Sequence, residues 1–519
     1  MKWNRPDVAV SALLGGMLTL PAQALELYVD VRTNQVFTEP GPHRAKLGSF
    51  QPMDESKPEQ APAKVATTED VKQVEAKLNK KIDAFVNKPK KPNEAKTTID
   101  GKGIRFETND GAFKFALNGR LHTDGNVFSG GDIATFQDKN NSGKWEPGDP
   151  YTINRVTDGT EIRRFRMEFA AQFFDNWKMK MQPEIANAGG NGTVGIRDAY
   201  VQYTGFDWGE WTVGQSKQPY SFQQMMSSND MVFMERSLEY EFTNRSVNRA
   251  IGLRYDIAGD WWSFATGIYG DTATRQAGGT TEADDEGWGF AGRVTMAPWY
   301  KPDELLHVGV SGAFRQPRTG DRTVRYNIAP TAISHVNYLD TGKLPDIRNS
   351  QFFNAELVGV YGPLSIESEY NATWFGRLDS AESGLTDGFL HGAHFDVAYS
   401  LTGESRAAFY DAKQAIIRRI VPDKNLDFGE GWGAWELKGR IAYVNMNDVG
   451  DPTNSGGAEA ATTFGVNWYF NNWARVMLDW THVLSLDVGK AGVNRRVLPL
   501  KNNDPNDWDI VQARVSLAY

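Results

Sequence analysis

The 519-residue chain has no cysteine, only seven histidines and no long apolar stretch. A membrane-spanning helix needs about 18 or more consecutive apolar residues, so helical spans are excluded. The lack of cysteine fits an oxidising compartment, where free thiols are a liability. The sequence also contains neither a Gly-x-Ser-x-Gly nucleophile motif nor a glycine-rich phosphate loop ahead of a helix. These two absences argue against an enzyme.

The few histidines show no metal-ligand spacing repeated with carboxylates. His391 and His394 stand among glycines, and we expect both on a surface loop. The formal net charge of −9 argues against nucleic acid as a partner. The mean hydropathy of −0.51 would by itself indicate a soluble protein. A membrane β-barrel gives the same average, however, because its strands alternate lipid-facing apolar and lumen-facing polar residues.

Residues 1–24 have the parts of a secretory signal peptide. Lys2 and Arg5 give a positive start, residues 8–20 an apolar core, and residues 22–24 a small-x-small cleavage site. The pattern predicts an exported protein. The alternative interpretation is a buried N-terminal helix.

The segment before the main domain divides into three parts. Residues 25–66 are predicted to form a periplasmic hairpin and a proline-rich linker, residues 67–88 an amphipathic helix, and residues 89–102 a second linker. The apolar residues of the helix recur at steps of three and four: Val71, Val74, Leu78, Ile82 and Phe85. A helix of about five turns is marginal alone, so we expect a short coiled coil that self-associates. Packing of the helix on its own barrel is the alternative.

From residue 103 to the last residue, short alternating segments are separated by turn residues. In the clearest hairpin, one strand face carries Phe165, Met167, Phe169, Ala171 and Phe173. The opposite face carries Arg164, Arg166, Glu168 and Gln172. In a barrel, such aromatic residues meet lipid and such charges meet water in the lumen.

The same alternation recurs at 464–470, 474–481 and in the final strand, which ends on Tyr519. A terminal aromatic behind alternating apolar residues looks like the signal that barrel-insertion machinery reads. Turns within these pairs are short, while 130–158 and 380–391 are long and polar. At about 26 residues per strand unit, residues 103–519 supply about sixteen strands. The sequence therefore predicts an all-β fold, a transmembrane antiparallel β-barrel preceded by a short periplasmic hairpin and a coiled-coil helix.

Several charged residues should face the lumen by their alternation. The basic ones are Lys114, Arg120, Arg164, Arg166, Lys178 and Lys180. Clustered guanidinium and ammonium groups attract anions, and arginine can hold an oxyanion with two parallel hydrogen bonds. Asp124, Glu168 and Glu184 share the same face. A transverse charge separation without net anion preference is therefore the competing interpretation.

The segment 138–149 resembles a calcium-binding loop. Oxygen-bearing side chains occupy loop positions 1, 3, 5, 9 and 12, with glycine at position 6 for the sharp turn. The candidate ligands are Asp138, Asn140, Ser142, Glu146 and Asp149. The loop departs from the usual pattern in Ser142 and in the shorter Asp149, and no helices flank it. A polar extracellular loop is the alternative, and no cofactor is required in either case.

Several stretches resemble the phosphate-selective porin O/P family. They include 113–120, 161–166, 197–200, 227–230 with 233–236, 400–406, 433–437 and 467–470. They occur in order over residues 103–519. The resemblance implies a sixteen-stranded homotrimeric channel in the outer-membrane lipid. It also implies an inserted loop that narrows the lumen, here residues 215–242.

In that family, basic side chains line the path, and a lysine with a nearby serine pair and an acidic residue forms the anion site. The matching residues here are Arg163, Arg164, Asp198, Ser227, Ser228 and Arg236. Arg120 and Arg166 join this candidate site through their lumen-facing alternation. Three positions before the serine pair the chain has Gln224 where the family has lysine. Because a compact ammonium charge holds phosphate, this departure predicts weak phosphate binding.

The leading function is an outer-membrane porin for passive diffusion of small solutes, with a preference for anions such as phosphate. One alternative is a non-selective general porin. A second alternative is a barrel that serves as an adhesin or an envelope tether through its long loops or its helix.

Overall fold

The structure, a computed structural model, describes most of the chain from residue 25 onward. The described residues are 25–31, 36–50, 77, 95–100, 103–130, 133–136, 150–154, 156–186, 194–244, 246–273, 285–320, 322–331, 333, 337–379, 384–489, 496–498 and 508–519. The predicted signal peptide, the predicted calcium loop at 138–149 and, apart from Lys77, the predicted helix at 67–88 lie outside these ranges. The calcium site therefore stays a prediction.

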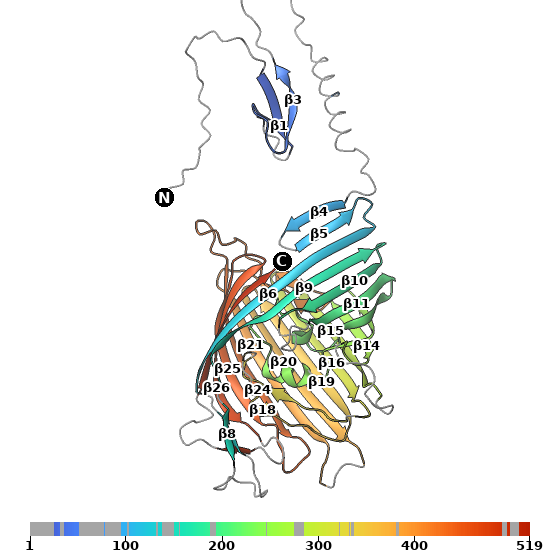
Figure 1. Cartoon of the computed structure of the whole chain (residues 1–519), viewed down its shortest axis with the longest axis vertical. Helices are drawn as coiled ribbons and strands as arrows, with labels where there is room; N and C mark the ends of the chain where they lie inside the picture. Colours follow the sequence, from blue (N-terminus) through green and yellow to red (C-terminus); the bar gives the residue numbers. More distant parts are fainter. Residues whose placement is uncertain are drawn as a thin grey trace, which may run out of the picture. The chain divides into compact units, whose positions relative to one another are not determined.

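The chain divides into two compact units, Met1–Pro89 and Lys90–Tyr519. The described part of the first unit is a three-stranded antiparallel sheet in the order β2-β1-β3 (Figure 1). Its strands are β1 (Leu25–Asp30), β2 (Val36–Phe37) and β3 (Arg44–Phe50). Residues 44–50 were predicted to lie in a linker, but the backbone of β3 pairs with β1 along its length. The Arg44 guanidinium also lies 3.5 Å from the centre of the Phe37 ring.

In the second unit, sixteen antiparallel strands of the described chain close a barrel (Figure 1). They are β6 (Phe113–Ser129), β9 (Gly159–Phe173), β10 (Trp177–Glu184), β11 (Gly195–Phe206), β12 (Gly209–Lys217), β13 (Arg249–Ala258), β14 (Trp262–Tyr269), β15 (Trp288–Lys301), β16 (Glu304–Gln316), β19 (Ile347–Tyr361), β20 (Leu364–Arg377), β21 (Gly388–Ser400), β24 (Ala434–Asp448), β25 (Ala458–Tyr469), β26 (Ala474–Asp487) and β28 (Trp508–Ala518). The predicted barrel and its strand number are confirmed. Closure removes every free sheet edge from the lipid, where unpaired backbone groups are costly.

The barrel closes where the last strand pairs with β6, from Asp509 opposite Ser129 to Ala518 opposite Arg120. Toward its N-terminal end, β6 pairs instead with β5 (Gly103–Thr108), which forms a hairpin with β4 (Ala95–Asp100). Residues 89–102 were predicted to form a linker without secondary structure, and the strand β4 corrects that prediction. Its alternation is too short to distinguish it from extended chain.

Alternation along the strands explains why this sequence forms a membrane barrel. On β9 and β10, Phe165 and Trp177 face outward with 40% and 48% of their surface exposed, while Arg164 and Arg166 are buried inside. Aromatic rings gather around the short turn after β11, where Phe206, Trp208 and Tyr255 pack together. Such rings form the interfacial belts of outer-membrane barrels. Among the described residues, no helix is both long and apolar enough to cross a membrane.

Three segments between strands fold into the barrel rather than away from it. The first follows β12 and contains α2 (Phe222–Met225) and α3 (Leu238–Asn244). The second follows β16 and contains β17 (Asn327–Ile328) and β18 (Leu339–Asp340). The third follows β21 and contains η1 (Arg406–Phe409), β22 (Tyr410–Asp411) and β23 (Ile416–Ile417). Outside the lumen, β7 (Ile133–Phe136), β8 (Tyr151–Asn154) and β27 (Arg496–Leu498) form a separate small sheet.

Apolar side chains of these segments bury against the inner wall, so the lumen contains hydrophobic cores of its own. The larger core joins Phe242, Tyr326 and Leu339 to the wall residues Phe375 and Val444. This packing fixes the segments in place, because each buried large apolar side chain contributes roughly 1.5–3 kcal/mol.

The predicted loop position of His391 and His394 is wrong, and so is the predicted surface position of His394, whereas His391 is half-exposed among outward-facing aromatic residues. Both lie within β21, and His394 is buried on the lumen side. The surrounding glycines made this stretch resemble a loop. In a strand they instead allow close packing, since a Cβ on Gly392 would lie 2.5 Å from the Glu239 side chain.

We predict that Gly214→Ala destabilises the barrel. Gly214 has φ +121°, and an added Cβ would lie 2.4 Å from the carbonyl oxygen of Ala199 on β11. Such a backbone conformation costs an alanine about 1–3 kcal/mol. The temperature at which the folded band disappears from an unboiled gel should fall. Gly292→Ala is the control, because its Cβ would meet its nearest atom at 3.6 Å. Equal temperatures for the two variants would contradict the prediction.

Candidate pore and anion site

A polar cavity of about 840 Å³ opens inside the barrel between the inserted segments and the wall that begins with β6 and runs to β15. Fifteen basic and eight acidic side chains of the described residues line it. The basic ones are Arg120, Arg163, Arg164, Arg166, Lys178, Lys180, Arg197, Lys217, Arg236, Arg249, Arg254, Arg293, Lys413, Arg418 and Arg419. The chain as a whole is acidic, so positive charge is concentrated at this cavity.

The segment 218–248, called the inserted loop below, forms one side of this cavity. The predicted loop began at residue 215, but residues 215–217 still belong to β12. The loop crosses to the opposite wall, where Met234 N donates to Asp479 on β26 (3.0 Å) and Lys438 Nζ on β24 donates to Val232 O (3.0 Å). The open path therefore lies on the side of β6 and β9–β15.

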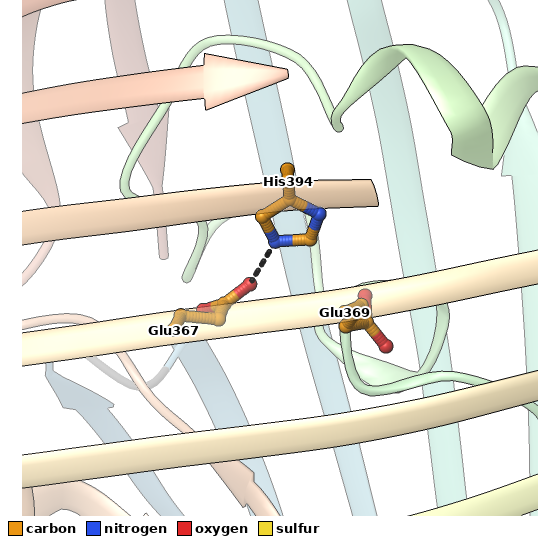
Figure 2. A group of neighbouring side chains, drawn as sticks. All are labelled: Glu367, Glu369 and His394. Carbon is orange, nitrogen blue, oxygen red and sulfur yellow. Dashed lines mark ion pairs between the residues drawn. The ribbon is translucent and has the colours of Figure 1, made fainter. Parts of the chain in front are cut away.

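Glu367, Glu369 and His394 of the wall, drawn in Figure 2, attach both α2 and α3 of the loop. Glu369 on β20 accepts from the backbone N–H groups of Phe222 (2.6 Å) and Gln223 (3.3 Å). The Gln223 side chain in turn donates to Glu367 (2.8 Å). His394 Nδ1 lies 2.5 Å from Glu239 of α3, and its Nε2 lies 3.6 Å from Glu367.

Ligand atoms of Glu367, Glu369 and His394 lie within 4.8 Å of one another, a spacing that would suit a metal ion. The Gln223 amide already lies between Glu367 and His394 Nε2, 2.8 and 3.1 Å away. Hydrogen bonds from the loop thus occupy these groups. We interpret the cluster as an anchor of the inserted loop.

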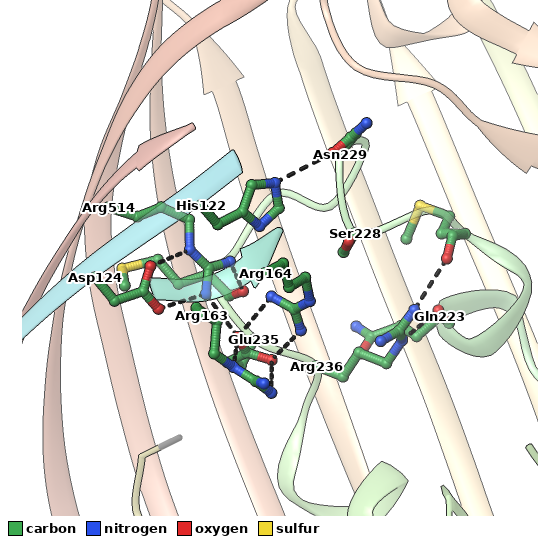
Figure 3. Close-up of polar contacts among 12 residues, drawn as sticks. His122, Asp124, Arg163, Arg164, Gln223, Ser228, Asn229, Glu235, Arg236 and Arg514 are labelled. Atoms are coloured by element: carbon green, nitrogen blue, oxygen red, sulfur yellow. Dashed lines mark hydrogen bonds and ion pairs between the residues drawn. The ribbon is translucent and has the colours of Figure 1, made fainter. Parts of the chain in front are cut away.

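A second anchor is Glu235, which lies between α2 and α3 in the sequence (Figure 3). Its carboxylate receives Arg163 Nε (3.0 Å), Arg164 Nη2 (2.8 Å) and Arg514 Nη2 (2.6 Å). Burial alone would raise the pKa of Glu235, but these three guanidinium charges outweigh it and hold the pKa well below its usual range. Arg514 also grips Asp124 with two hydrogen bonds, at 2.7 and 2.6 Å.

These contacts change the role of two predicted residues. Arg163 and Arg164 line the cavity as expected, but both are ion-paired with Glu235. Asp124 and Glu161 also pair with members of this group, so its three arginines face three carboxylates. Arg163 and Arg164 therefore mainly hold the loop in place, because the carboxylate of Glu235 neutralises much of their charge.

Arg120 has a different environment. Its Nη1 donates to the hydroxyls of both Ser227 and Ser228, at 3.0 Å each, and no carboxylate of the described residues lies within 4.0 Å of it. The three side chains line the cavity together with Asn229, whose Oδ1 lies 3.1 Å from His122 Nε2. This group combines an uncompensated guanidinium with two hydroxyl donors, which is the chemistry of an oxyanion contact.

The other predicted residues are engaged in pairs. Arg166 is ion-paired with Glu184, and Asp198 accepts from Arg249 Nε at 2.6 Å. Arg236 lies in the inserted loop, where it donates to the backbone carbonyls of Gln223 (2.7 Å) and Met226 (2.9 Å). Arg236 therefore stabilises the loop as well as contributing charge to the cavity.

Gln224 does not face the cavity. It is fully buried, it is not among the described lining residues, and its amide donates to Gln218 O at 3.0 Å. An ammonium group reaches the same region from β12, because Lys217 Nζ donates to Met225 O (3.0 Å) and Met226 O (2.8 Å), next to the serine pair. Lys217 was not predicted as a site residue from sequence, although it lies two residues after Gln215 and therefore on the same face of β12.

The third inserted segment, 401–433, also reaches the cavity, and sequence reasoning missed it. Arg406 is buried in a two-pronged ion pair with Glu436 of β24, at 2.6 and 3.0 Å. Ile416 and Ile417 pack against Phe222 of α2. Asp411, Lys413, Gln414, Arg418 and Arg419 then line the cavity. The path is bounded by two segments that enter the barrel from different connections.

A family model and a relative of known sequence agree on one family. Residues 147–514 match the family described as phosphate-selective porin O and P. Porin O of Pseudomonas aeruginosa is 24% identical over 402 residues, which cover 72% of this chain and 84% of that protein. Similar solved structures include OmpT of Vibrio cholerae, with 12% identity, a TM-score of 0.42 and coverage of 79% of this chain and 98% of that one. OmpF of Salmonella typhi, in complex with daunomycin, has 12% identity, a TM-score of 0.41 and coverage of 80% and 100%.

We predict that Glu235→Gln raises the preference of the cavity for anions and increases fluctuations of its ion current. Glu210→Gln is the matched control, because it also removes one carboxylate of the lining. Among the described residues, Glu210 accepts a side-chain hydrogen bond from Gln202 on the neighbouring strand (3.0 Å) and has no contact with the loop. In planar bilayers, both variants should shift the reversal potential toward anions, and only the loop variant should add current noise.

The wild-type ion pairs should tolerate mild acid. Because the folded pKa of Glu235 is lowered, their stabilisation is complete above the ordinary glutamate pKa of about 4.3 and is lost only as pH falls through the lowered value. Current noise that rises in the wild type between pH 7 and 5 would contradict this assignment.

Proposed function

Because the chain belongs to the phosphate-selective porin O and P family, we propose that its cavity is a diffusion channel that favours anions and admits phosphate. The protein is an outer-membrane porin, and small solutes cross the barrel through the water-filled lumen. The fold and family indicate a channel rather than an enzyme.

The observation that carries the anion preference is the charge of the lining. Fifteen lysines and arginines face eight acidic side chains among the described residues, whereas the whole chain has a net charge of −9. A narrow cleft between low-dielectric walls focuses such a field and raises the local concentration of the opposite ion. The excess of basic side chains in the lining favours an anion preference over the transverse charge separation without net preference that was considered from sequence.

The contact for phosphate is proposed at Arg120, Ser227 and Ser228. The guanidinium supplies charge without a competing carboxylate, and the two hydroxyls, each 3.0 Å from Arg120 Nη1, can turn their hydrogens toward an oxyanion. Lys217 adds an ammonium group that is held only by neutral carbonyls. A phosphate that enters this site replaces its bound water molecules one at a time by charge-assisted hydrogen bonds. Because the exchange is stepwise, the ion can also leave the site and continue through the channel.

We also propose that the protein is a homotrimer. The apolar stripe of residues 67–88 has the spacing of a short coiled coil, and three copies would bury it. The family resemblance described from sequence supports the same number of subunits.

Phosphate block of the chloride current tests the contact. Ser227→Ala combined with Ser228→Ala, and separately Arg120→Gln, should weaken the block about 10-fold or more, as expected when a charge-assisted hydrogen bond of about 1.5–3 kcal/mol is lost. Arg254→Gln is the charge-matched control, since Arg254 lines the cavity but is paired with Asp256. It should shift the reversal potential toward cations as Arg120→Gln does, with the block preserved.

A wild-type channel that already prefers cations would overturn the anion preference and leave a general porin. A block that survives in the double serine variant would instead place the phosphate contact elsewhere.

Deletion of residues 25–89, which stops before β4, tests the role of the N-terminal unit in assembly. The temperature at which the trimer separates into folded monomers on a gel should fall, because the coiled coil no longer links the subunits. The monomer barrel should stay folded at that temperature. An unchanged separation temperature would show that the helix has no part in assembly.

A further inference from the structure

A row of three fully buried polar residues crosses neighbouring strands beneath the inserted loop. Arg475 on β26 pairs with Ser516 on β28, and Ser516 pairs with His122 on β6. Each has at most 1% of its surface exposed. Directly opposed residues of an antiparallel pair have Cβ atoms about 4.5–5.5 Å apart, so the three side chains are immediate neighbours on the lumen face.

Polar atoms of all three residues have no hydrogen-bond partner among the described residues. They are Nε and Nη2 of Arg475, Oγ of Ser516 and Nδ1 of His122. The residues use their other polar atoms on the loop: Arg475 Nη1 donates to Met231 O at 2.9 Å, and His122 Nε2 contacts Asn229 at 3.1 Å (Figure 3). Buried donors without partners are rare because they lose their hydration and gain nothing in return.

The free edge of Arg475 is the edge that other arginines of this lumen use to grip a carboxylate. Arg514 uses Nε and Nη2 on Asp124 at 2.7 and 2.6 Å. Arg440 uses the same two atoms on Asp396, and Arg406 on Glu436. No Asp or Glu of the described chain lies within 4.0 Å of the Arg475 guanidinium nitrogens. Its edge is thus shaped for an anion that the protein itself does not supply.

The electrostatic surroundings point the same way. Four guanidinium groups act on the His122 ring: those of Arg514, Arg164, Arg120 and Arg475. Carboxylates compensate Arg514 and Arg164, whereas Arg120 contacts only hydroxyls and Arg475 contacts only a carbonyl and a phenol. Arg120 and Arg475 therefore have no carboxylate of the described residues within 4.0 Å, and burial of a charge without a close partner is unfavourable.

We propose that Arg475, Ser516 and His122 bind a small monovalent anion, with the size and charge of chloride, between the barrel wall and the inserted loop. Arg475 offers its Nε–Nη2 edge and Ser516 its hydroxyl. His122 donates from Nδ1 when the Asn229 amide turns its NH2 group toward Nε2. None of the three residues lines the open cavity, so the ion lies apart from the diffusion path.

This anion is a fixed part of the structure, distinct from the solutes that diffuse through the channel. The residues that hold it also hold Asn229 and Met231 of the inserted loop. The ion therefore fastens the middle of the loop, between the Glu369 anchor and the Glu235 anchor. Binding of this anion does not depend on the selectivity of the channel.

Anomalous diffraction from bromide-soaked crystals of the full-length protein tests the site directly. An anomalous peak should lie within hydrogen-bonding distance of Nε and Nη2 of Arg475. The peak should weaken in Ser516→Ala, a substitution that removes one donor and leaves the fold intact. Ser263→Ala is the control, because the Ser263 hydroxyl also faces inward but is partnered by Thr295 at 2.7 Å. Its peak should equal that of the wild type.

A stability measurement supports the same conclusion in solution. At equal ionic strength, the wild type should unfold at a higher temperature in chloride than in gluconate, because a bound ion stabilises the folded state by mass action. The difference should shrink in Ser516→Ala and persist in Ser263→Ala. Density at the site without anomalous signal would identify a water molecule. That result, or equal unfolding temperatures of the wild type in the two salts, would overturn the proposal.

Discussion

The structure of the lumen depends on the attachment of the inserted loop to the wall through ion pairs of Glu235 and hydrogen bonds to Glu369. Glu235 reaches three guanidinium groups, and Glu369 receives the backbone of α2 from the opposite side. Breaking one partner of such a pair leaves a buried charge alone, which typically costs about 3–5 kcal/mol. A loop held in this way cannot drift across the opening. The width of the path is therefore set by electrostatics as much as by apolar packing.

This arrangement separates the arginines of the lumen into two groups. In one group, which includes Arg406, Arg440 and Arg514, the guanidinium donates two hydrogen bonds to one carboxylate and so holds two parts of the structure together. The other, in which Arg120 is the clearest case, contacts only neutral acceptors and keeps its charge available. The cavity lining also contains both kinds, because Arg166 and Arg254 are paired with carboxylates and Arg120 is not. A simple count of basic residues on the inner face cannot tell the two groups apart.

Much of the fold could be predicted from sequence because a barrel strand repeats every two residues. The alternation around Phe165 and Arg164 indicated which face meets lipid, and the spacing of such segments indicated sixteen strands. The pairing of charges could not be predicted, because the partners are distant in the chain. Arg164 lies 71 residues from Glu235, and Arg514 lies 390 residues from Asp124. For the same reason the candidate site was recognised by its residue types, while the roles of Arg163, Gln224 and His394 were misjudged. Whether a residue lines the path depends on how a loop folds back, and strand periodicity contains no information on that.

The seam of the barrel has a consequence for how the chain can be extended. The last strand pairs with β6 only as far as Arg120, and Gly119 then exchanges two backbone hydrogen bonds with Tyr519. Beyond this point β5 already occupies the edge of β6, from Leu117 to Lys114. The β4–β5 hairpin therefore blocks further pairing of β28 with β6 and so limits the register of β28. Residues fused after Tyr519 have no edge to continue along and must leave the sheet, so a purification tag placed there would sit outside the wall and leave its shear unchanged.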